Sequence, residues 1–238
     1  MVNATTAGAP ARPGLTRSRI LQTALTAVDE HGLDELSMHR LGAELGVKAM
    51  SLYNHVKGKD GLLDGIVELL WSEVGVKTPT PEVDWGDAMR GLAHSLRDLV
   101  HRHPRAAPLL MSRQVMPEEA LRICDAYLRV MRDGGVPEEQ AVALLRTVFA
   151  YGIGYALTEL SCLPAGPADA GEYDDIARIR YMSSLIPSNV PDDLMRVALK
   201  VCGECDMAAQ FALGIDLMIH GLDARLKEST QEDIPRHR

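Results

Sequence analysis

The sequence predicts an all-α fold, with a small N-terminal three-helix domain followed by a larger helical domain. Aromatic residues make up only 4% of the 238 residues, whereas Ala, Leu and Met, which favour helix over strand, are common. Apolar residues recur at helical spacing in successive segments, and no segment alternates apolar and polar residues as a strand does. Three later segments begin with proline followed by two acidic residues, which is typical of a helix N-terminus.

The N-terminal part contains three expected helices. The first covers residues 17–31, with Thr16 as N-cap, and places five apolar residues on one face: Ile20, Leu21, Ala24, Leu25 and Val28. Ser37 is the expected cap of a second, short helix, which Gly46 ends. A third short helix is expected at residues 48–54.

The remaining helices follow two breaks in the pattern. Residues 57–61, which include two glycines, break the pattern before the apolar face of a helix at 59–74. Prolines mark a linker at 75–84. Further helices are expected at 85–101, 117–133, 137–162, 191–201 and 206–228, with a breaker-rich loop at 164–173. We divide the chain into four parts: a disordered N-terminal arm at 1–14, a helix-turn-helix domain at 15–62, a regulatory domain at 63–228 and a flexible tail at 229–238.

Charge is distributed unevenly along the chain. The formal net charge is −8, which by itself disfavours binding to nucleic acid. Residues 1–60 hold seven basic and six acidic side chains, or +1, and the remaining residues hold 18 and 27, or −9. Because the local field decides phosphate binding, a DNA-binding surface is expected at the N-terminal end only.

No stretch approaches the roughly 20 consecutive apolar residues of a membrane span. Residues 1–14 lack the apolar run of a secretion signal, so we expect a cytoplasmic protein that does not contact a membrane. The four cysteines form no disulfide framework. Cys202 and Cys205 match C-x-x-C, a redox pair or half of a zinc site, but no second pair stands at zinc-ribbon spacing and packing within a helix is favoured.

Residues 37–56 match the requirements of a helix-turn-helix. Two short helices that cross steeply need a small residue where they approach, a glycine to turn and an apolar anchor, and Gly42, Gly46 and Leu52 stand at these spacings. The outward face of the second helix then offers donors suited to base edges and phosphates: Lys48, Ser51, Tyr53, Asn54 and His55. A surface helical hairpin with a solvated polar face explains the same residues.

The segment from Leu52 to Leu63 resembles the signature of the tetracycline-repressor (TetR) family, L-Y-x-H-(V/F)-x-x-K before an apolar helix. The resemblance extends to residues 84–87, to His103-Pro104-Arg105 and to residues 211–223, which are similar to the C-terminal regulatory domain of the tetracycline repressors. It covers most of residues 16–228. It implies a ligand-responsive transcriptional regulator, and we favour a repressor that binds a palindromic operator as a homodimer.

The resemblance also implies roles for single residues. Tyr53 and His55 would contact the DNA backbone, Lys59 would hold a phosphate, and Ser51 replaces a threonine that contacts DNA. His39, Ala49 and Asn54 depart from the tetracycline repressors, so a different operator is expected, with base contacts from Lys48, His39 or Asn54. The full set of expected DNA-binding residues is Thr16, Arg17, Ser37, His39, Lys48, Ala49, Ser51, Tyr53, Asn54, His55 and Lys59.

A dimer is expected because one monomer presents a single recognition helix. Helices 137–162 and 206–228 are the expected seam, and the resemblance implies a four-helix bundle across the two-fold axis. The second helix places a stripe at Ile215, Met218, Leu222 and Leu226, with glycines at 214 and 221 that allow close approach. The alternative is that this helix belongs to the core of its own chain.

The tetracycline repressors bind a magnesium-chelated drug through a histidine and polar residues. Residues 108–113 contain no histidine here, and Leu92 replaces an asparagine, so we expect a mostly apolar effector, no metal and no cofactor rather than Mg-tetracycline. The candidate ligand-binding residues are Met111, Met116, Tyr127, Met131, Phe149, Tyr151 and Tyr155, each of which packing in the core also explains. His94, His101, His103 and His220 are not expected to bind a metal.

Other function classes have less support. A helical enzyme would need a catalytic constellation, and no Gly-x-Ser-x-Gly, His-Glu-x-x-His or phosphate loop is present, so we assign no catalytic residues. A helical interaction module without DNA contact is disfavoured by the lysines at 48, 57 and 59. An activator of the same family fits the residues as well as a repressor does. The expected mechanism is that an effector favours a conformer in which helix 59–74 moves the DNA-binding domains apart.

Overall fold

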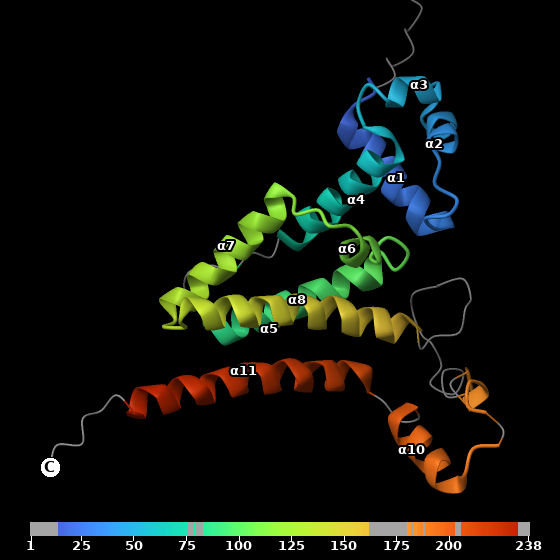
Figure 1. The fold of residues 1–238 in the computed structure, drawn as a ribbon. Helices are drawn as coiled ribbons and strands as arrows, with labels where there is room; N and C mark the ends of the chain where they lie inside the picture. The colour runs from blue at the N-terminus through green and yellow to red at the C-terminus, as the bar shows by residue number, and fades with distance from the viewer. Residues whose placement is uncertain are drawn as a thin grey trace, which may run out of the picture.

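The computed structural model describes residues 14–75, 79, 83–161, 180–181, 183–187, 189–202 and 206–232. Within these ranges every regular element is a helix and no strand is present, which confirms the all-α prediction. The chain forms an N-terminal head and a larger helical body, connected by one long helix (Figure 1).

The head consists of α1 (Arg17–His31), α2 (Met38–Leu45) and α3 (Ala49–Leu52). The two expected caps are present: the side-chain oxygen of Thr16 accepts from the backbone N–H of Arg19 at 3.2 Å, and that of Ser37 accepts from Arg40 at 3.2 Å. The predicted apolar face of α1 is buried against the neighbouring helices. The caps and this face fix where the two longer head helices begin and how they pack.

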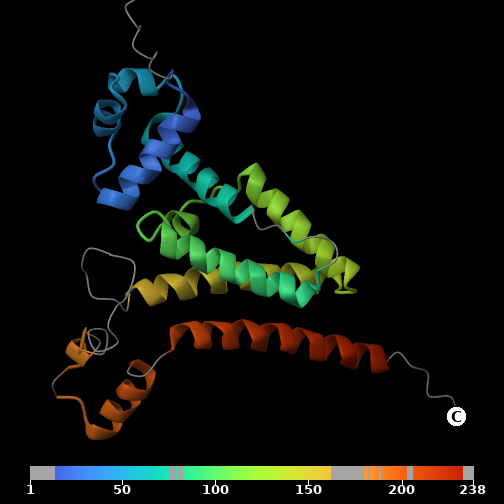
Figure 2. The ribbon, with the colours of Figure 1, turned by 180° about the vertical axis from the view of Figure 1, so that it is seen from behind.

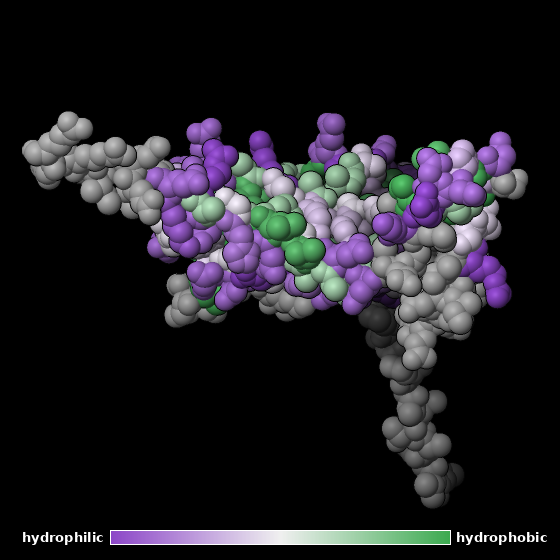
Figure 3. Space-filling model, turned by 90° about the horizontal axis from the view of Figure 1, so that it is seen from below, coloured by the Kyte–Doolittle hydropathy of each residue, from purple (hydrophilic) through white to green (hydrophobic). Residues whose placement is uncertain are grey.

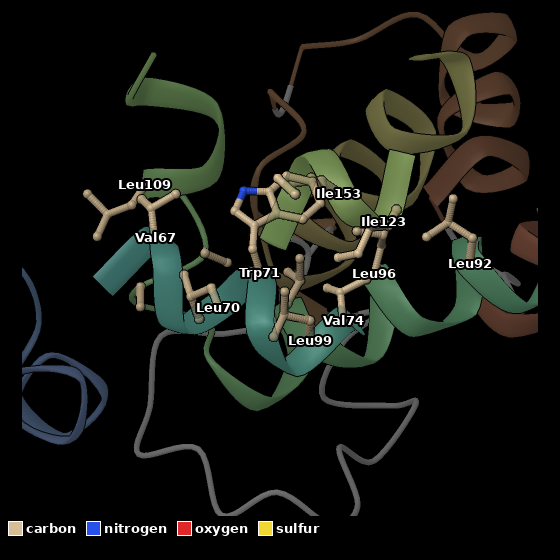
Figure 4. Packing of buried hydrophobic residues seen from close by; sticks show 14 of the residues in the cluster. Val67, Leu70, Trp71, Val74, Leu92, Leu96, Leu99, Leu109, Ile123 and Ile153 are labelled. Carbon is tan, nitrogen blue, oxygen red and sulfur yellow. The ribbon is translucent and has the colours of Figure 1, made fainter. Parts of the chain in front are cut away.

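The connecting helix α4 (Gly58–Gly75) belongs to the head at one end and to the body at the other. Before its midpoint, Gly65 lies against Leu21 of α1, so close that a Cβ on Gly65 would clash with Cδ2 of Leu21. Near its end, the Trp71 ring meets the Phe149 ring edge-on at 5.3 Å between centroids. Figure 4 shows the second contact region, where α4 residues lie among buried side chains of the body.

The body is built from α5 (Trp85–Arg102), α7 (Glu118–Asp133), α8 (Glu138–Ser161) and α11 (Met207–Glu232). The views from front and back both place α5 and α8 side by side, with α11 along them on the side away from the head (Figures 1 and 2). α5 and α8 approach closely at Gly152, where a Cβ would lie 3.0 Å from Cβ of Leu96.

Two short helices complete the body. α6 (Leu109–Ser112), which the sequence did not predict, follows the corner after α5, and α10 (Asp192–Cys202) precedes α11 and projects from the other helices (Figure 1). α3 ends at Leu52 instead of residue 54, and α11 continues to Glu232 instead of ending at residue 228. The predicted loop at 164–173 and Cys205 lie outside the described residues.

Among the described helices, only α8 is long and apolar enough to span a membrane by length and composition. Its residues Leu145, Val148 and Ile153 are buried in the core of the body, and 39% of its most apolar window is covered by other parts of the chain. The sequence of α8 is therefore that of a helix at the centre of a helical domain.

We predict that Gly42→Ala destabilises the head. A Cβ at Gly42 would stand 2.9 Å from the carbonyl oxygen of Val47 and 3.1 Å from the amide of Ala49, and these backbone atoms cannot rotate away. The expected loss is about 1–3 kcal/mol of unfolding free energy, measured by denaturant titration. Gly91→Ala is the control: it is a helical glycine with no atom within 4 Å of its Cβ position, and alanine there should stabilise by about 0.5–1 kcal/mol. Equal effects of the two changes would contradict the proposed close approach.

Candidate DNA-binding head and regulatory core

The turn between α2 and α3 has the geometry that a helix-turn-helix requires. Gly46 ends α2 with φ +71°, a left-handed conformation that side-chain-bearing residues rarely adopt. The amide of Val47 then donates to the carbonyl of Gly42 at 2.8 Å, which brings the chain back across the end of α2. Because position 42 has no side chain, the start of α3 lies directly against α2.

The second helix of this unit presents one face to solvent. Leu52 is completely buried and anchors α3 to the head, whereas Lys48, Tyr53 and Asn54 are exposed and Ser51 is half-buried. Tyr53 and Asn54 lie on the turn that follows α3, because the helix itself is only one turn long. The amides of residues 55 and 56 both donate to the carbonyl of Leu52, which holds this turn in place.

The structure also exposes a residue that the sequence argument missed. Met50 on α3 has 74% of its surface accessible, the highest value among the exposed large hydrophobic side chains of the described chain. It stands between the half-buried Ala49 and Ser51, on the side of α3 opposite the buried Leu52. An apolar side chain at such a position is able to contact the methyl group of thymine. Its place on the side of α3 opposite the one buried anchor, Leu52, was the signal in the sequence.

The other predicted DNA-binding residues have different surroundings. Thr16 and Ser37 cap helices, and Arg17 pairs with Glu68 of α4 at 2.7 Å. His39 is exposed on α2, and Ala49 packs where Gly42 leaves room. His55 is half-buried, and Lys59 is exposed in the first turn of α4. The structure thus brings α3, its following turn and the start of α4 together at one end of the molecule.

The start of α4 is held by the body through Arg113, which follows α6. Its guanidinium nitrogens lie 2.6 Å and 2.8 Å from Oδ1 of Asp64 and 3.0 Å from Oδ1 of Asp60. These hydrogen bonds raise the pKa of Arg113, so the guanidinium stays charged. Asp60 is the neighbour of Lys59 in sequence. Arg113 thus connects the residue after α6 to the turn of α4 that carries Lys59.

Inside the body, α4, α5, α7 and α8 surround an apolar interior (Figure 4). Tyr127 and Met131 of α7 are 2% and 0% exposed, and burial raises the pKa of Tyr127 to about 12. Leu92, which replaces an asparagine of the tetracycline repressors, is fully buried here. No group of three or more His, Cys, Asp or Glu side chains capable of holding a metal occurs in the described parts of the chain.

A second aromatic group lies between α8 and α11. The Tyr151 ring stacks on Phe211 at 5.1 Å and the Tyr155 ring meets Phe211 edge-on at 5.3 Å. Both hydroxyls donate to backbone carbonyls near the start of α11: Tyr151 to that of Phe211 at 3.0 Å, and Tyr155 to that of Met207 at 3.2 Å. Phe211 was not among the predicted residues, although it is one of only two phenylalanines in the chain.

A buried carboxylate stands beside this aromatic group. Glu159 of α8 is 6% exposed and accepts from Nε and Nη2 of Arg97 at 2.8 Å and 2.9 Å, with Nε2 of His101 at 2.7 Å. Burial opposes ionisation of Glu159, but the hydrogen bonds from His101 and Arg97 outweigh it, so its pKa lies below the ordinary value. The guanidinium carbon of Arg97 lies 5.4 Å from the centre of the Phe211 ring.

The seven predicted ligand-binding residues do not form one site in this structure. Tyr127, Met131 and Phe149 pack in the interior below α4, and Tyr151 and Tyr155 belong to the aromatic group at α11. Met111 and Met116 are 58% and 61% exposed, so they are surface residues here. Helical spacing could not predict which way these two side chains point, because α6 is a single turn followed by an extended residue, Arg113.

The predicted stripe on α11 packs against its own chain, with Ile215 buried and the other three residues partly buried. Ile215 is 1% exposed, and Met218, Leu222 and Leu226 pack against the core of the same chain. Gly214 allows close approach to Tyr151, whose hydroxyl would stand 2.1 Å from a Cβ at that position. The exposed apolar residues are instead Leu213 and Leu217, at 59% and 65%. Figure 3, a view from the α11 side, shows hydrophobic residues in the middle of a mostly hydrophilic surface.

A groove between α8 and α11 continues this surface. It has a volume of about 470 Å³ and is lined from α8 by Glu139, Gln140, Ala143, Leu144 and Thr147, and from α11 by Met218, Leu222 and Arg225. The solvent side of α8 carries the small residues Ala143, Thr147 and Ala150 together with Arg146. The two helices predicted as the dimer seam thus leave part of their surface accessible.

Comparisons with known proteins cover both parts of the chain. The family model for bacterial regulatory proteins of the tetR family matches residues 20–66, and the model for the tetracyclin repressor-like C-terminal domain matches residues 78–226. The class A tetracycline repressor of Escherichia coli is 28% identical over 213 residues, 89% of this chain and 92% of that protein. The HTH-type transcriptional repressor DrrR1 of Streptomyces coeruleorubidus is 30% identical over 149 residues, and the match spans 63% of this chain and only 55% of DrrR1.

Solved structures give the same grouping. The crystal structure of the Streptomyces coelicolor TetR family protein ActR in complex with actinorhodin aligns with a TM-score of 0.71 at 30% identity. This alignment covers 89% of this chain and 97% of ActR, so it includes head and body together.

We predict that Glu159→Gln destabilises the body. The change leaves Arg97 without its buried counter-charge, and breaking such a pair costs about 3–5 kcal/mol. Glu118→Gln is the control, because Glu118 pairs with Arg122 at an exposed i,i+4 position of α7, where about 0.5 kcal/mol or less is expected. The stability of both variants is measured by thermal unfolding. A Glu159 variant as stable as the control would contradict the role of Glu159 as the buried partner of Arg97.

Proposed function

The chain belongs to the TetR family of bacterial transcriptional regulators, and we propose that it acts as a homodimeric, cytoplasmic repressor of a palindromic operator. The observation that carries this proposal is the turn at Gly42 and Gly46, which presents α3 and the start of α4 at one end of the molecule. The chain divides at α4 into the DNA-binding part proposed at 15–62 and the regulatory part at 63–228. We assign it no catalytic role.

For DNA recognition we propose two kinds of contact. Lys48, Met50 and Asn54 supply the base contacts, since they are exposed on or next to α3. Tyr53 and Lys59 contact the phosphate backbone on either side, in a near-neutral head attached to an acidic body. The predicted residues that cap helices, Thr16 and Ser37, act through the ends of those helices, whose free N–H groups attract phosphate.

Dimerisation supplies the second recognition unit. Two heads must lie about one helical turn of DNA apart, roughly 34 Å, to occupy successive major grooves. We propose that α8 and α11 of two chains form a four-helix bundle, in which Leu213 and Leu217 of α11 meet the small-residue side of the partner's α8. This seam uses a different face of α11 from the stripe predicted from sequence, because that stripe packs within the chain.

The effector is proposed to be a small, mostly apolar molecule. The interior below α4 is lined by apolar side chains such as Trp71, Leu92 and Ile153, which suit an apolar ligand. Mg-tetracycline is therefore not the proposed ligand, although the class A tetracycline repressor is a relative. The complex of ActR with actinorhodin supports a small-molecule effector for this chain.

Release of DNA would pass through α4. An effector that displaces α6 moves Arg113, and Arg113 holds Asp60 and Asp64 in the first two turns of α4. The conformer with displaced α4 changes the separation of the two heads. The effector then lowers operator affinity to the extent that it binds this conformer more tightly.

Selection of genomic DNA fragments by the purified protein tests the proposed function. Enrichment of fragments that share a palindrome, with an affinity that falls steeply with salt, is the expected result. If no genomic fragment is enriched more than fragments of a random library, the proposal of specific DNA recognition is contradicted.

We predict that Tyr53→Phe weakens binding to selected and mismatched duplexes by the same factor. Removing one hydroxyl hydrogen bond to phosphate costs about 1 kcal/mol, or roughly fivefold in affinity, without changing sequence preference. Affinities for both duplexes are measured by fluorescence anisotropy. A change in the ratio between the two duplexes would instead assign Tyr53 to base recognition.

We predict that Leu217→Glu converts the dimer to a monomer. The charge would be placed in the centre of the proposed apolar seam, where Leu217 is 65% exposed in the single chain. Leu121→Glu is the control, because Leu121 is 56% exposed on α7, outside the seam. Analytical ultracentrifugation should show a dimer for the wild type and the control. A dimeric Leu217 variant would place the seam elsewhere.

A further inference from the structure

Basic side chains gather at the corner between α5 and α6. Arg102, His103 and Arg105 each contact either α1 of the head or the end of α4. The DNA-binding proposal makes no use of this corner, and the sequence argument set its histidines aside. His103 differs from the two arginines because its charge changes near neutral pH.

Both ring nitrogens of His103 face a carboxylate. Nδ1 lies 2.7 Å from Oδ2 of Asp29 on α1, and Nε2 lies 3.1 Å from Oε1 of Glu73 on α4. The side chain is only 14% exposed. Its backbone is fixed as well, since its N–H donates to the carbonyl of Leu99 at 3.0 Å and its carbonyl accepts from Ala107 at 2.8 Å. The imidazole therefore joins three elements: head, connecting helix and body.

This arrangement requires the doubly protonated ring. A neutral imidazole has one N–H donor, so it could serve only one of the two carboxylates and would turn a lone pair toward the other. The hydrogen bond to Asp29 raises the pKa of His103 above its ordinary value of 6.5, against burial, and the charge of Glu73 raises it further. Oδ1 of Asp29 is buried and has no hydrogen-bond partner among the described residues, so Asp29 depends on His103.

Two arginines and a second histidine are the other basic groups of this corner. Arg102 pairs with Glu73 from the side of α5, and Arg105 donates to the backbone carbonyls of Asp29 and Glu30 at the end of α1. The neighbouring histidine, His31, lies 3.6 Å from Glu30, and its side chain is 52% exposed. Within this corner His103 is thus the buried group that a proton can switch.

We propose that His103 is a proton-dependent latch between the head and the body. Protonated, it ties the end of α1 and the end of α4 to the α5–α6 corner. Deprotonated, it has one N–H donor for two carboxylates, and whenever that donor serves Glu73 the end of α1 is held by Arg105 alone among these side chains. The DNA-binding consequence rests on the function proposed above: a loosened head must be ordered again on binding, so operator affinity falls as the pH rises.

The direction follows from linkage. Because the pKa of His103 is raised in the latched state, the stabilisation is complete below the ordinary value of 6.5 and is lost as the pH rises through the raised pKa. Between pH 6.5 and the raised pKa of His103, the equilibrium constant for opening the latch increases by about tenfold per pH unit. Regulation by pH would in this way act on the same α4 that the effector moves.

Two measurements on the protein without DNA test the latch. Nitrogen-15 spectra of labelled histidines, assigned with His103→Gln, should show protons on both ring nitrogens of His103 at neutral pH and a titration above 6.5. Hydrogen exchange at the end of α1, corrected for intrinsic rates, should become about tenfold faster per pH unit in the same window. In His103→Gln the exchange should be fast and independent of pH, whereas His31→Gln should behave as the wild type.

The third measurement uses the duplex recovered by genomic selection. Its affinity for the wild type and for His31→Gln should fall about three- to tenfold from about pH 6 to about pH 9, and this component should be absent in His103→Gln. A singly protonated His103 that titrates at or below 6.5, or an unchanged pH dependence in His103→Gln, would overturn the latch. If no duplex is recovered, the proposed function fails, and the spectra and exchange rates still decide the latch.

Discussion

The packing of α4 into two separate cores is the constraint on which the rest of the structure depends. Before its midpoint the helix has a glycine pressed against Leu21 of the head, and near its end it buries Trp71 against Phe149 of the body. A helix is stiff over this length, so a displacement at one end reaches the other. Arg113 and His103 add polar contacts near the two ends of the same helix. The head therefore has no position that is independent of the interior of the body.

The body itself relies on a charged pair enclosed by aromatic rings. Glu159 is buried on an otherwise apolar face of α8, and Arg97 of α5 both neutralises it and lies against Phe211 of α11. Three helices are thus aligned by one guanidinium, with Tyr151 taking the room that Gly214 leaves. Such a pair contributes little net stability compared with apolar packing, but it fixes which faces of the three helices meet.

Local patterns in the sequence predicted the helices because each depends on nearby residues. The caps at Thr16 and Ser37, the turn at Gly46 and the apolar face of α1 are all set within a few positions along the chain. The pairs that build the core and the corner join residues far apart, such as Arg97 with Glu159 and Asp29 with His103, and no local pattern reveals them. For the same reason the stripe of α11 fits an interior and an interface equally, and no local pattern reveals that Tyr151 packs against Gly214.

The one-sided exposure of α3 separates two kinds of change that the chain tolerates. Lys48, Met50 and Asn54 are exposed on or next to α3, so under the proposed function new residues at these positions would change the operator sequence without changing the body. The acids at Asp29, Asp60 and Glu73 belong to the first part of the chain, yet their basic partners lie between residues 102 and 113. Under the proposed function, a head transplanted onto the body of a relative would keep its operator specificity and lose its effector response unless these charges were carried across as a matched set. Within a lineage, the reading residues are free to drift one at a time, whereas the acids of the first part and the bases of the corner must change together.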